Sequence, residues 1–378
     1  MPKILYLVTE DWYFCSHRLP IARAARDAGF EVVVVTRVRR HGAAIAAEGF
    51  RVIPLEQRRG ALNPVADLAM LWRLLGIYRA ERPDLVHHVA LKPVLYGTLA
   101  SRAARVTRVV NALGGLGYVF SSPGWKARLL RPMVRFVFRF HGRARQNRFI
   151  VQNPDDRGQL VGEIGVPANR IVVIRGSGVD IRYFSPMPEP EPPAVVALVS
   201  RMLWDKGVGE VVEAARMLKE RGTTVKVVLV GDEDPENPES IPKRRLLEWS
   251  REGIVEWWGR RDDITKVWAQ CHICVLPSYR EGLPKALLEA AACGRPIVTT
   301  DTPGCREIVH DGENGLLVPP RDAAALADAI ERLTRDPLLR ARMGACGRRM
   351  VEEEFSEERV VEQTLALYRS LLADRWPA

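Results

Sequence analysis

Two cations stand in a short segment that reads SRMLWDKG from Ser200 onward. It directly follows an apolar run over residues 195–200 that is typical of a buried strand. Arg201 and Lys206 lie in the segment, and Gly207 ends it. Two cations at the end of a strand suit a diphosphate, which must leave a reaction with negative charge. Taken alone, the pattern fits two solvated surface cations equally well.

A second segment, EGLPKALLE, begins at Glu281 and leads into a predicted helix over residues 285–292. Pro284 fits the first helical position, because proline lacks the N–H that would be unpaired there. The helix N-terminus would offer backbone N–H groups to a phosphate, and Gly282 would let the backbone come close. Glu281 would reach a sugar beyond the phosphates, and Glu289 would accept hydrogen bonds from a diol such as ribose. Glu289 could instead face solvent, but its apolar neighbours make an unpartnered carboxylate costly.

These residues need strands to position them, and both halves of the chain alternate apolar runs with helical patterns. Strands are predicted at residues 4–8, 31–36, 85–89, 108–111 and 149–152, and again at 195–200, 225–230, 254–258, 273–276, 296–299 and 315–318. Such alternation is typical of βαβ units around a buried parallel sheet. Five prolines in SPMPEPEPP, residues 185–193, predict a linker.

The sequence therefore predicts an α/β protein with two Rossmann-like domains. The predicted parts are a first domain at residues 1–184, the linker at 185–193, a second domain at 194–355, and a helix at 356–378 that packs back on the first domain.

The net charge of +10 over 378 residues is unevenly distributed. Residues 1–183 have a balance of +16, whereas residues 184–378 have a balance of −6. A basic field attracts anions such as nucleic acid, an acidic membrane surface or a phosphorylated substrate. No apolar window is long enough to span a bilayer, and acidic residues directly after the first apolar run disfavour a signal peptide, so we expect a cytoplasmic protein. Cys271 and Cys274 lack a second pair at zinc-binding spacing, and we interpret them as core cysteines.

Several segments together resemble the retaining glycosyltransferases of family four, which have the GT-B fold. These segments are SRMLWDKG, EGLPKALLEAAACGRPIV with its two glutamates separated by seven residues, TPGCREIVHDGENGLLVP and GSGVDIRYFSP. The resemblance covers essentially the whole chain and is densest over residues 175–319. It implies two Rossmann-like domains that face each other across a cleft, a nucleotide-sugar donor, and no metal or other cofactor.

The resemblance also implies roles for single residues. Arg201 and Lys206 would bind the donor diphosphate, and Glu281 would contact the transferred sugar. The implied donor site consists of Arg201, Lys206, Gly259, Arg260, Glu281, Gly282, Leu283, Pro284, Lys285 and Glu289. Within it, the amides around Gly282 would face the β-phosphate, Glu289 would hold the ribose, and Gly259 with Arg260 would line the nucleobase pocket.

The first half departs from the family pattern in two places. Many relatives have a histidine where this chain reads VVNALGG, residues 109–115, and their glycine-rich first loop is replaced by TEDWYFCSHR, residues 9–18. His87 and His88 end a predicted strand, and each could act in catalysis or be buried. Further candidates for contacts to a phosphate or to the acceptor are His17, Arg18, Lys92 and Asn111.

Residues 125–140 carry two stripes at helical spacing. The basic stripe consists of Arg128, Arg131, Arg135 and Arg139, and the apolar stripe consists of Trp125, Leu129, Met133, Phe136 and Phe140. We expect Pro132 to kink or restart the helix. A basic amphipathic helix with aromatics fits an anionic bilayer interface, although a core helix with a solvated arginine face fits the pattern too.

The segments HHVALKPVLYG, VVNALGGLGYVFSS and RGSGVD resemble bacterial relatives that extend sugars on polyprenyl diphosphate for surface polysaccharides. The resemblance therefore predicts a peripheral enzyme on the inner face of the cytoplasmic membrane. It would transfer a hexose or an N-acetylhexosamine from UDP, with retention, to a lipid-linked or other saccharide acceptor.

Three other classes of protein share some of these sequence features. An epimerase or phosphorylase of the same fold, acting on sugar phosphates, is an alternative. A nucleic-acid-binding protein would explain the basic half, but aromatic stacking motifs are absent from the sequence. A nicotinamide dehydrogenase is disfavoured because no Gly-x-Gly-x-x-Gly follows either opening strand.

Overall fold

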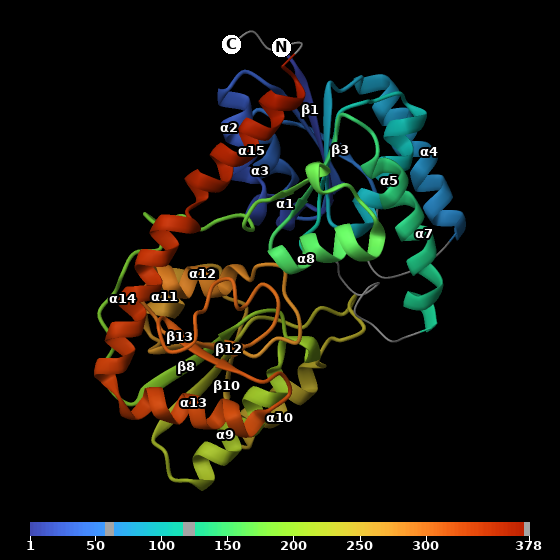
Figure 1. Cartoon of the computed structure of the whole chain (residues 1–378). Helices are drawn as coiled ribbons and strands as arrows, with labels where there is room; N and C mark the ends of the chain where they lie inside the picture. Colours follow the sequence, from blue (N-terminus) through green and yellow to red (C-terminus); the bar gives the residue numbers. More distant parts are fainter. Residues whose placement is uncertain (57–63, 116–124, 374–378) are drawn as a thin grey trace. The chain divides into compact units, whose positions relative to one another are not determined.

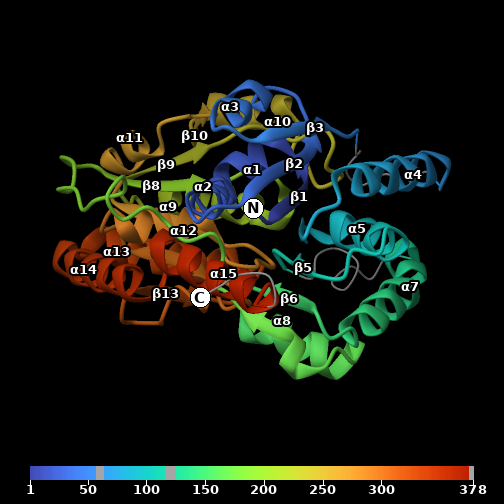
Figure 2. The same cartoon turned by 90° about the horizontal axis from the view of Figure 1, so that it is seen from above.

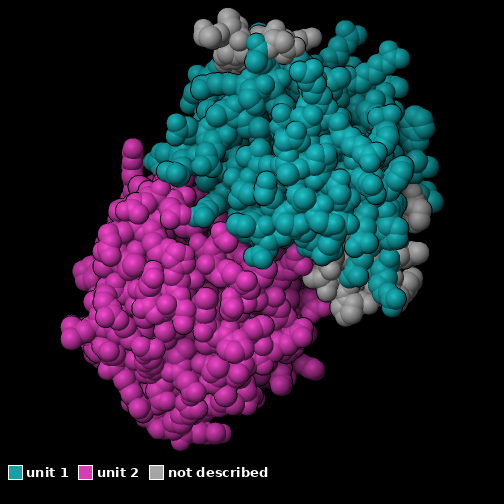
Figure 3. Space-filling view, in the orientation of Figure 1, with its two compact units in different colours: residues 1–177, 358–378 teal, residues 178–357 magenta. Residues whose placement is uncertain are grey.

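The computed structural model describes residues 1–56, 64–115 and 125–373. By their contacts the residues form two compact units, one of residues 1–177 with 358–378 and one of residues 178–357 (Figure 3). Each unit is built on one parallel β-sheet covered by helices (Figure 1). The α/β class with two Rossmann-like domains is thereby confirmed.

The sheet of the first unit has seven parallel strands in the order β3-β2-β1-β4-β5-β6-β7. The strands are β1 (Lys3–Glu10), β2 (Glu31–Arg37), β3 (Arg51–Pro54), β4 (Leu85–Val89), β5 (Val109–Ala112), β6 (Asn147–Val151) and β7 (Ile171–Val173). The helices are α1 (Asp11–His17), α2 (Leu19–Asp27), α3 (Gly42–Ala47), α4 (Pro64–Glu81), α5 (Leu91–Ala103), α7 (Trp125–Gly142), α8 (Pro154–Gln159) and the short turns η1 (Leu160–Ile164) and η2 (Ala168–Arg170).

Two of these strands, β3 and β7, were not predicted. Both lie at the edges of the sheet; β3, with the sequence RVIP, has an exposed arginine at its start and an exposed proline at its end, and β7 has only three residues. Such short edge strands carry too few residues for a periodic signal.

The central strand β1 shows why the unit folds in layers. Its residues alternate between the two faces, so Ile4 and Tyr6 join one apolar cluster while Leu5 and Leu7 join another on the opposite face. Because both faces are covered, nearly the whole strand is apolar.

The C-terminal helix α15 (Glu357–Leu371) belongs to the first unit for most of its length. Leu367, Tyr368 and Leu371 are buried in the same cluster as Tyr6 and Phe30. The last helix of the chain therefore covers one face of the first sheet.

The sheet of the second unit has six parallel strands in the order β10-β9-β8-β11-β12-β13. They are β8 (Ala194–Val199), β9 (Val225–Val230), β10 (Glu256–Gly259), β11 (Ile273–Leu276), β12 (Ile297–Thr300) and β13 (Gly315–Val318). The helices are η3 (Trp204–Lys206), α9 (Val208–Glu220), α10 (Lys243–Arg251), α11 (Ile264–Ala269), α12 (Lys285–Ala292), α13 (Ala323–Arg335) and α14 (Pro337–Glu354).

In both sheets the chain order reverses beside the first strand, between β1 and β4 and between β8 and β11. At such a switch point two loops diverge from the carboxyl ends of neighbouring strands and leave a crevice for ligands. The loops after β8 and β11 carry the two charged segments singled out from the sequence.

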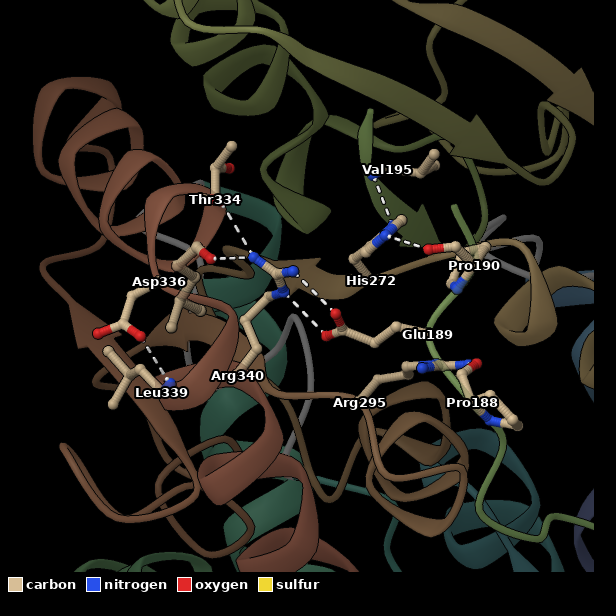
Figure 4. A network of polar contacts seen from close by, with 11 residues as sticks. Pro188, Glu189, Pro190, Val195, His272, Arg295, Thr334, Asp336, Leu339 and Arg340 are labelled. Carbon is tan, nitrogen blue, oxygen red and sulfur yellow. Dashed lines mark hydrogen bonds and ion pairs between the residues drawn. The ribbon is translucent and has the colours of Figure 1, made fainter. Parts of the chain in front are cut away.

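The proline-rich residues 185–193 lie within the second unit, because the division of the chain falls between residues 177 and 178. The guanidinium of Arg340 donates two hydrogen bonds of 2.8 Å to the carboxylate of Glu189 (Figure 4). Arg295 donates to the carbonyl of Pro188 at 2.8 Å. These contacts bind the segment along one side of the unit.

His272 lies beside the same segment and is held by it. Its Nδ1 accepts from the amide of Val195 at 3.0 Å, so its Nε2 carries the proton and donates to the carbonyl of Pro190 at 3.0 Å (Figure 4). The neighbouring Cys271 and Cys274 are buried free thiols, as the sequence predicted.

Candidate functional site

The candidate site lies at the carboxyl end of the second sheet, at the switch point between β8 and β11. Lys206, in the turn after β8, contacts the carboxylate of Glu281, in the loop after β11, through its ammonium group. The hydroxyl of Ser278 donates to the same carboxylate oxygen of Glu281 at 2.7 Å. The sequence did not single out Ser278, because a lone serine after a strand carries no distinctive signal.

Two glycines let the loops of this site approach each other. Gly207 has φ of +73°, and a Cβ atom there would stand 2.2 Å from the carbonyl oxygen of Pro277. Gly304 has φ of +82°, and its Cβ would stand 2.4 Å from the carbonyl oxygen of Gly282. Both positions therefore require glycine for two reasons: the backbone is left-handed, and a side chain would clash with the neighbouring loop.

Arg201 extends from the end of β8 toward the loop after β9. Its guanidinium pairs with the carboxylate of Asp234 at 2.6 Å, and 43% of its side chain is exposed. The amide of Arg260, after β10, donates to the carboxylate of Asp232 at 3.2 Å. The structure thus brings Arg201 and Arg260 to one acidic loop, GDEDPE, whose charge follows a strand and was visible in the sequence.

Helix α12 begins beside this site. Pro284 is the cap residue, one position before the predicted one, and within the described residues no side chain caps this end of the helix. Gly282 and Leu283 are buried in the turn that leads into it. The N-terminus of an α-helix carries a partial positive charge and unbonded N–H groups, which favour an anion.

Glu289 lies one turn into α12 and shows 12% of its side chain to solvent. Among the described residues no donor forms a hydrogen bond to its carboxylate, and the nearest cation is the Lys285 ammonium at 3.9 Å. Burial raises the pKa of this carboxyl to about 7, against the opposing effect of Lys285. A nearly enclosed carboxylate without donors is ready to accept hydrogen bonds from a ligand.

In the first unit His87 and His88 are both buried and point to opposite faces of β4. His87 shares a hydrogen bond through Nδ1 with Tyr368, whereas His88 contacts Tyr78 and Asn111 at 2.9 and 2.8 Å. Burial lowers the pKa of His87 well below its ordinary value, with a further contribution from Arg18, and lowers that of His88 to about 4. Both rings are therefore neutral groups of the interior, and their burial and contacts indicate a structural role in place of the predicted catalytic one.

Two further candidates of this unit are already engaged with neighbours. Asn111 is buried, and its Oδ1 accepts from His88 and from Thr98 at 3.2 Å. Lys92, at the start of α5, pairs with Asp67 of α4 at 2.8 Å. A ligand would therefore have to replace these protein partners before it could bind either side chain.

His17 and Arg18 stand where α1 meets α2, after the carboxyl end of β1. The ring of His17 stacks on Tyr13 at 4.1 Å and contacts the Ser16 hydroxyl at 2.6 Å. Arg18 is only 4% exposed, yet its guanidinium makes a single hydrogen bond of 3.4 Å, to the carbonyl of His17, and its Nε is unpartnered among the described residues. A buried guanidinium without an anion is costly, so this position suits an anionic ligand.

Helix α7 continues through Pro132 without a break. Its buried face carries Val134, Val137 and Phe138, which belong to the core. The predicted apolar stripe lies elsewhere on the helix: Met133, Phe136 and Phe140 are 45%, 71% and 44% exposed. The side chains of Trp125 and Leu129 lie outside the described residues.

The arginines of the basic stripe are placed differently from one another. Arg128, Arg135 and Arg139 are exposed, and Arg131 is half-buried. Within the described residues, no helix combines the length and the apolar character needed to cross a bilayer.

Similarity to known proteins agrees with this arrangement. Residues 3–153 match the family model described as glycosyl transferase 4-like, and residues 193–336 match that of the glycosyl transferases group 1. The chain is 30% identical over 364 residues to N,N'-diacetylbacillosaminyl-diphospho-undecaprenol alpha-1,3-N-acetylgalactosaminyltransferase of Campylobacter jejuni, covering 93% of this chain and 94% of that protein. It is also 24% identical to UDP-Gal:alpha-D-GlcNAc-diphosphoundecaprenol alpha-1,3-galactosyltransferase of Escherichia coli, over 83% of this chain and 82% of that one.

Solved structures share the fold. Sucrose-phosphate synthase from Thermosynechococcus elongatus superposes with a TM-score of 0.80 at 22% identity, covering 99% of this chain and all of that one. Anabaena Alr3699/HepE, solved in complex with UDP and glucose, superposes with a TM-score of 0.78 at 21% identity, covering 98% and 100%. With two parallel sheets in this order, both family models and a relative matched over nearly its whole length, the chain belongs to the family-four, group 1 glycosyltransferases of the GT-B fold.

Proposed function

We propose that the protein transfers a hexose or an N-acetylhexosamine from UDP to a sugar linked to polyprenyl diphosphate, with retention of the anomeric configuration. The observation that carries the donor half is the Lys206–Glu281 contact beside the N-terminus of α12, at the switch point of the second sheet. The acceptor half is supported by the named substrates of the two relatives. We also propose that the transfer takes place on the cytoplasmic face of the membrane.

The donor would bind so that its diphosphate meets the positive groups of the site. Lys206 and Arg201 are each held by one carboxylate, Glu281 and Asp234, in the free protein. A diphosphate can share both cations and lie over the amino end of α12, with Gly282 and Leu283 in the turn below it. Glu289 would then accept hydrogen bonds from the ribose, and the backbone near Gly259 and Arg260 would border the base.

In this arrangement Glu281 would be released in part from Lys206 and could accept hydrogen bonds from hydroxyls of the transferred sugar. The bond between the anomeric carbon and the β-phosphate oxygen breaks, and the bond to the acceptor oxygen forms on the same face. The proton of the acceptor hydroxyl passes to the departing phosphate oxygen. The protein lowers the barrier by stabilising the negative charge on that oxygen.

For the acceptor, Arg18 is the strongest candidate in the first unit. Its buried guanidinium lacks a carboxylate partner among the described residues, and a diphosphate would supply the missing negative charge. His17, next to it, could orient the same group.

An anionic membrane is the proposed partner of the outer surface of helices α4 and α7. Figures 1 and 2 show α4, α5 and α7 side by side on one flank of the first unit. The exposed aromatic and apolar residues of α7 are matched on α4 by Val65, Leu68 and Trp72, which are 79%, 56% and 65% exposed. A surface of this kind, flanked by Arg128, Arg135 and Arg139, suits the headgroup layer of an anionic bilayer.

A panel of nucleotide sugars, screened by thermal stabilisation and then by transfer to polyprenyl-diphosphate sugars, tests the proposal. We expect UDP-sugars to raise the melting temperature and one of them to yield a lipid-linked disaccharide with retained configuration. Turnover of the sugar nucleotide without acceptor, to an epimer or a sugar phosphate, would instead indicate an epimerase or a phosphorylase.

A further inference from the structure

A pocket of about 890 Å³ opens in the first unit, and none of the proposed donor or acceptor residues lines it. Val109 and Asn147, which begin β5 and β6, line it, so it lies at the amino-terminal edge of the sheet. Helices α5, α7 and α15 contribute their last turns. Substrates of parallel sheets bind at the opposite, carboxyl edge. The proposed reaction therefore leaves this pocket unused.

The pocket is lined by five arginines and, among its described lining residues, by no aspartate or glutamate. The five are Arg102, Arg105, Arg145, Arg148 and Arg170. Where their guanidinium groups form hydrogen bonds, the acceptors are backbone carbonyls: Arg148 and Arg170 both donate to the carbonyl of Arg145 at 2.9 Å. Arg102 lies over the ring of Phe140 at 4.5 Å. Of the described residues, none forms an ion pair with these five side chains.

Arg105 and Arg145 are exposed and make no side-chain hydrogen bond to the described residues. Arg105 also holds a left-handed backbone with φ of +61°, a conformation that costs a non-glycine residue about 1 kcal/mol. This backbone closes the C-terminus of α5: the amide of Arg105 donates to the carbonyl of Arg102 at 3.1 Å, and the amide of Val106 donates to the carbonyl of Ser101 at 2.8 Å. The closure places the exposed Arg105 among the residues that line the pocket.

The cluster is strongly positive even after the helix ends are counted. Each of the three helix C-termini contributes about −0.5 charge, so together they offset about −1.5 of the +5 from the guanidinium groups. Burial, together with the charge of Arg170, lowers the pKa of Arg148. The like charges of Arg148 and Arg170 therefore repel each other in the free protein, and a bound anion would relieve that repulsion.

We propose that this pocket is a second anion site, which binds a phosphate or diphosphate group. Guanidinium forks match phosphate oxygens in pairs, and no carboxylate among the described lining residues neutralises the five that surround this pocket. The phosphate could belong to an anionic lipid headgroup, because Phe140 both borders the pocket and lies on the exposed stripe of α7, or to a soluble phosphate compound. The inference does not rest on the proposed transfer reaction.

The test compares a pocket variant with a control of equal charge. Arg105→Gln/Arg145→Gln removes two exposed pocket cations, and Arg342→Gln/Arg349→Gln removes two exposed cations of α14 in the second unit. Binding of inorganic pyrophosphate is measured by calorimetry on the full chain with UDP at saturation, so that a donor site is occupied. Co-sedimentation with phosphatidylcholine vesicles, with and without phosphatidylglycerol, tests the lipid source, and melting temperatures check that both variants are folded.

We expect the pocket variant to lose about tenfold in affinity for at least one phosphate-bearing probe, while the control stays within about twofold of the wild type. Loss of pyrophosphate binding would identify a soluble ligand, and loss confined to phosphatidylglycerol vesicles would identify a headgroup. If both folded variants bind both probes equally well, or if the wild type binds neither probe, the pocket is not an anion site. UDP occupies the donor site and both variants keep Arg18, so a difference between the variants reports on the pocket and does not depend on whether the transfer reaction is as proposed.

Discussion

The ammonium of Lys206 contacts the carboxylate of Glu281 across 75 residues of sequence. The two residues follow β8 and β11, which are neighbours in the sheet although α9, β9, α10, β10 and α11 separate them in the chain. The contact keeps both side chains at the switch point while no ligand competes for them. A diphosphate would replace Glu281 as a partner of Lys206.

Replacing Lys206 by alanine should lower turnover at least tenfold, which corresponds to about 1.4 kcal/mol of transition-state stabilisation. The loss follows because the charge that develops on the leaving diphosphate would lack one of its two cations. Steady-state kinetics with the UDP-sugar identified by the panel measure it. Lys266→Ala, an exposed lysine of α11 in the same unit, serves as the control and should leave turnover unchanged. Near-wild-type turnover of a folded Lys206→Ala protein would remove this residue from the mechanism.

Glu289→Gln should stabilise the free protein at pH 8 while weakening UDP binding. Because burial raises the pKa of Glu289 to about 7, the folded state binds a proton more tightly than the unfolded state, and this contribution to stability is lost as the pH rises from about 4.5 through 7. The amide of the Glu289→Gln variant does not ionise, so the variant does not lose this stability at high pH. We therefore expect the melting temperature of the variant to exceed that of the wild type by more at pH 8 than at pH 5.

Calorimetry with UDP completes the test of Glu289. The amide should weaken binding at pH 8, because it replaces an ionised acceptor of two hydroxyl groups by a neutral one. An equal affinity for UDP in both proteins would place Glu289 outside the nucleoside site. A stability difference that does not change with pH would contradict the raised pKa.

Arg18→Met should raise the KM for a polyprenyl-diphosphate acceptor about tenfold or more and leave the affinity for UDP unchanged. A buried guanidinium that lacks a carboxylate partner contributes little to the stability of the free protein, so the melting temperature should stay the same or rise. Arg40→Gln, an exposed arginine of the same unit, provides the comparison. A fall in stability with an unaltered KM would show that Arg18 has a structural role only.

Phe136→Gln/Phe140→Gln should weaken binding to phosphatidylglycerol vesicles by about tenfold without lowering the melting temperature. Both rings are exposed, so their removal should change the stability of the fold little. Burial of each ring in a bilayer interface, by contrast, contributes about 1.5–3 kcal/mol to the free energy of membrane binding. Leu338→Gln, an 83% exposed leucine of the second unit, is the control and should have no effect. Equal vesicle binding by all three proteins would exclude α7 from a membrane surface.

Glu189→Gln should lower the free energy of unfolding by about 3 kcal/mol or less, because it leaves the buried Arg340 without its carboxylate while Glu189 itself keeps a 32% exposed side chain. Burial tends to raise the pKa of Glu189, but the hydrogen bonds and charge of Arg340 outweigh it and hold the pKa below 4.5. The stabilisation is therefore present at neutral pH and is lost as the pH falls through that lowered pKa.

Urea denaturation at pH 7 and at acidic pH checks this expectation. The difference between wild type and Glu189→Gln should shrink at the lower pH, where the wild-type carboxylate takes up a proton. Glu313→Gln, at a 66% exposed position, should change stability by less than about 0.5 kcal/mol. If the two substitutions have equal effects, the contact in Figure 4 does not hold residues 185–193 to the unit.

Local sequence patterns predicted much of the fold. Four strands, β4, β9, β11 and β13, begin and end at the predicted residues, as does helix α12. These strands are buried on both faces, so their apolar runs stand out against polar flanks. The charged loops after β8 and β11 could be recognised because they directly follow predicted strands. A parallel sheet places its ligand-binding residues at the carboxyl ends of its strands.

Other features depended on contacts between residues far apart in the chain. Local sequence shows that His87 and His88 lie in a strand, but only the packing of Tyr368 from α15 and of Tyr78 from α4 buries them. In the same way Arg201 acquires Asp234 as a partner through the pairing of β8 with β9.

The sequence by itself thus determined the two parallel sheets, the two charged segments after β8 and β11, and the family. Periodicity and strand-end chemistry act over a few residues, and a single chain displays them directly. Only the tertiary structure decided which polar side chains are buried, which face of α7 meets solvent, and that five arginines from separate elements line one pocket. Those outcomes depend on long-range packing, which brings together residues whose separation in sequence carries no periodic signal.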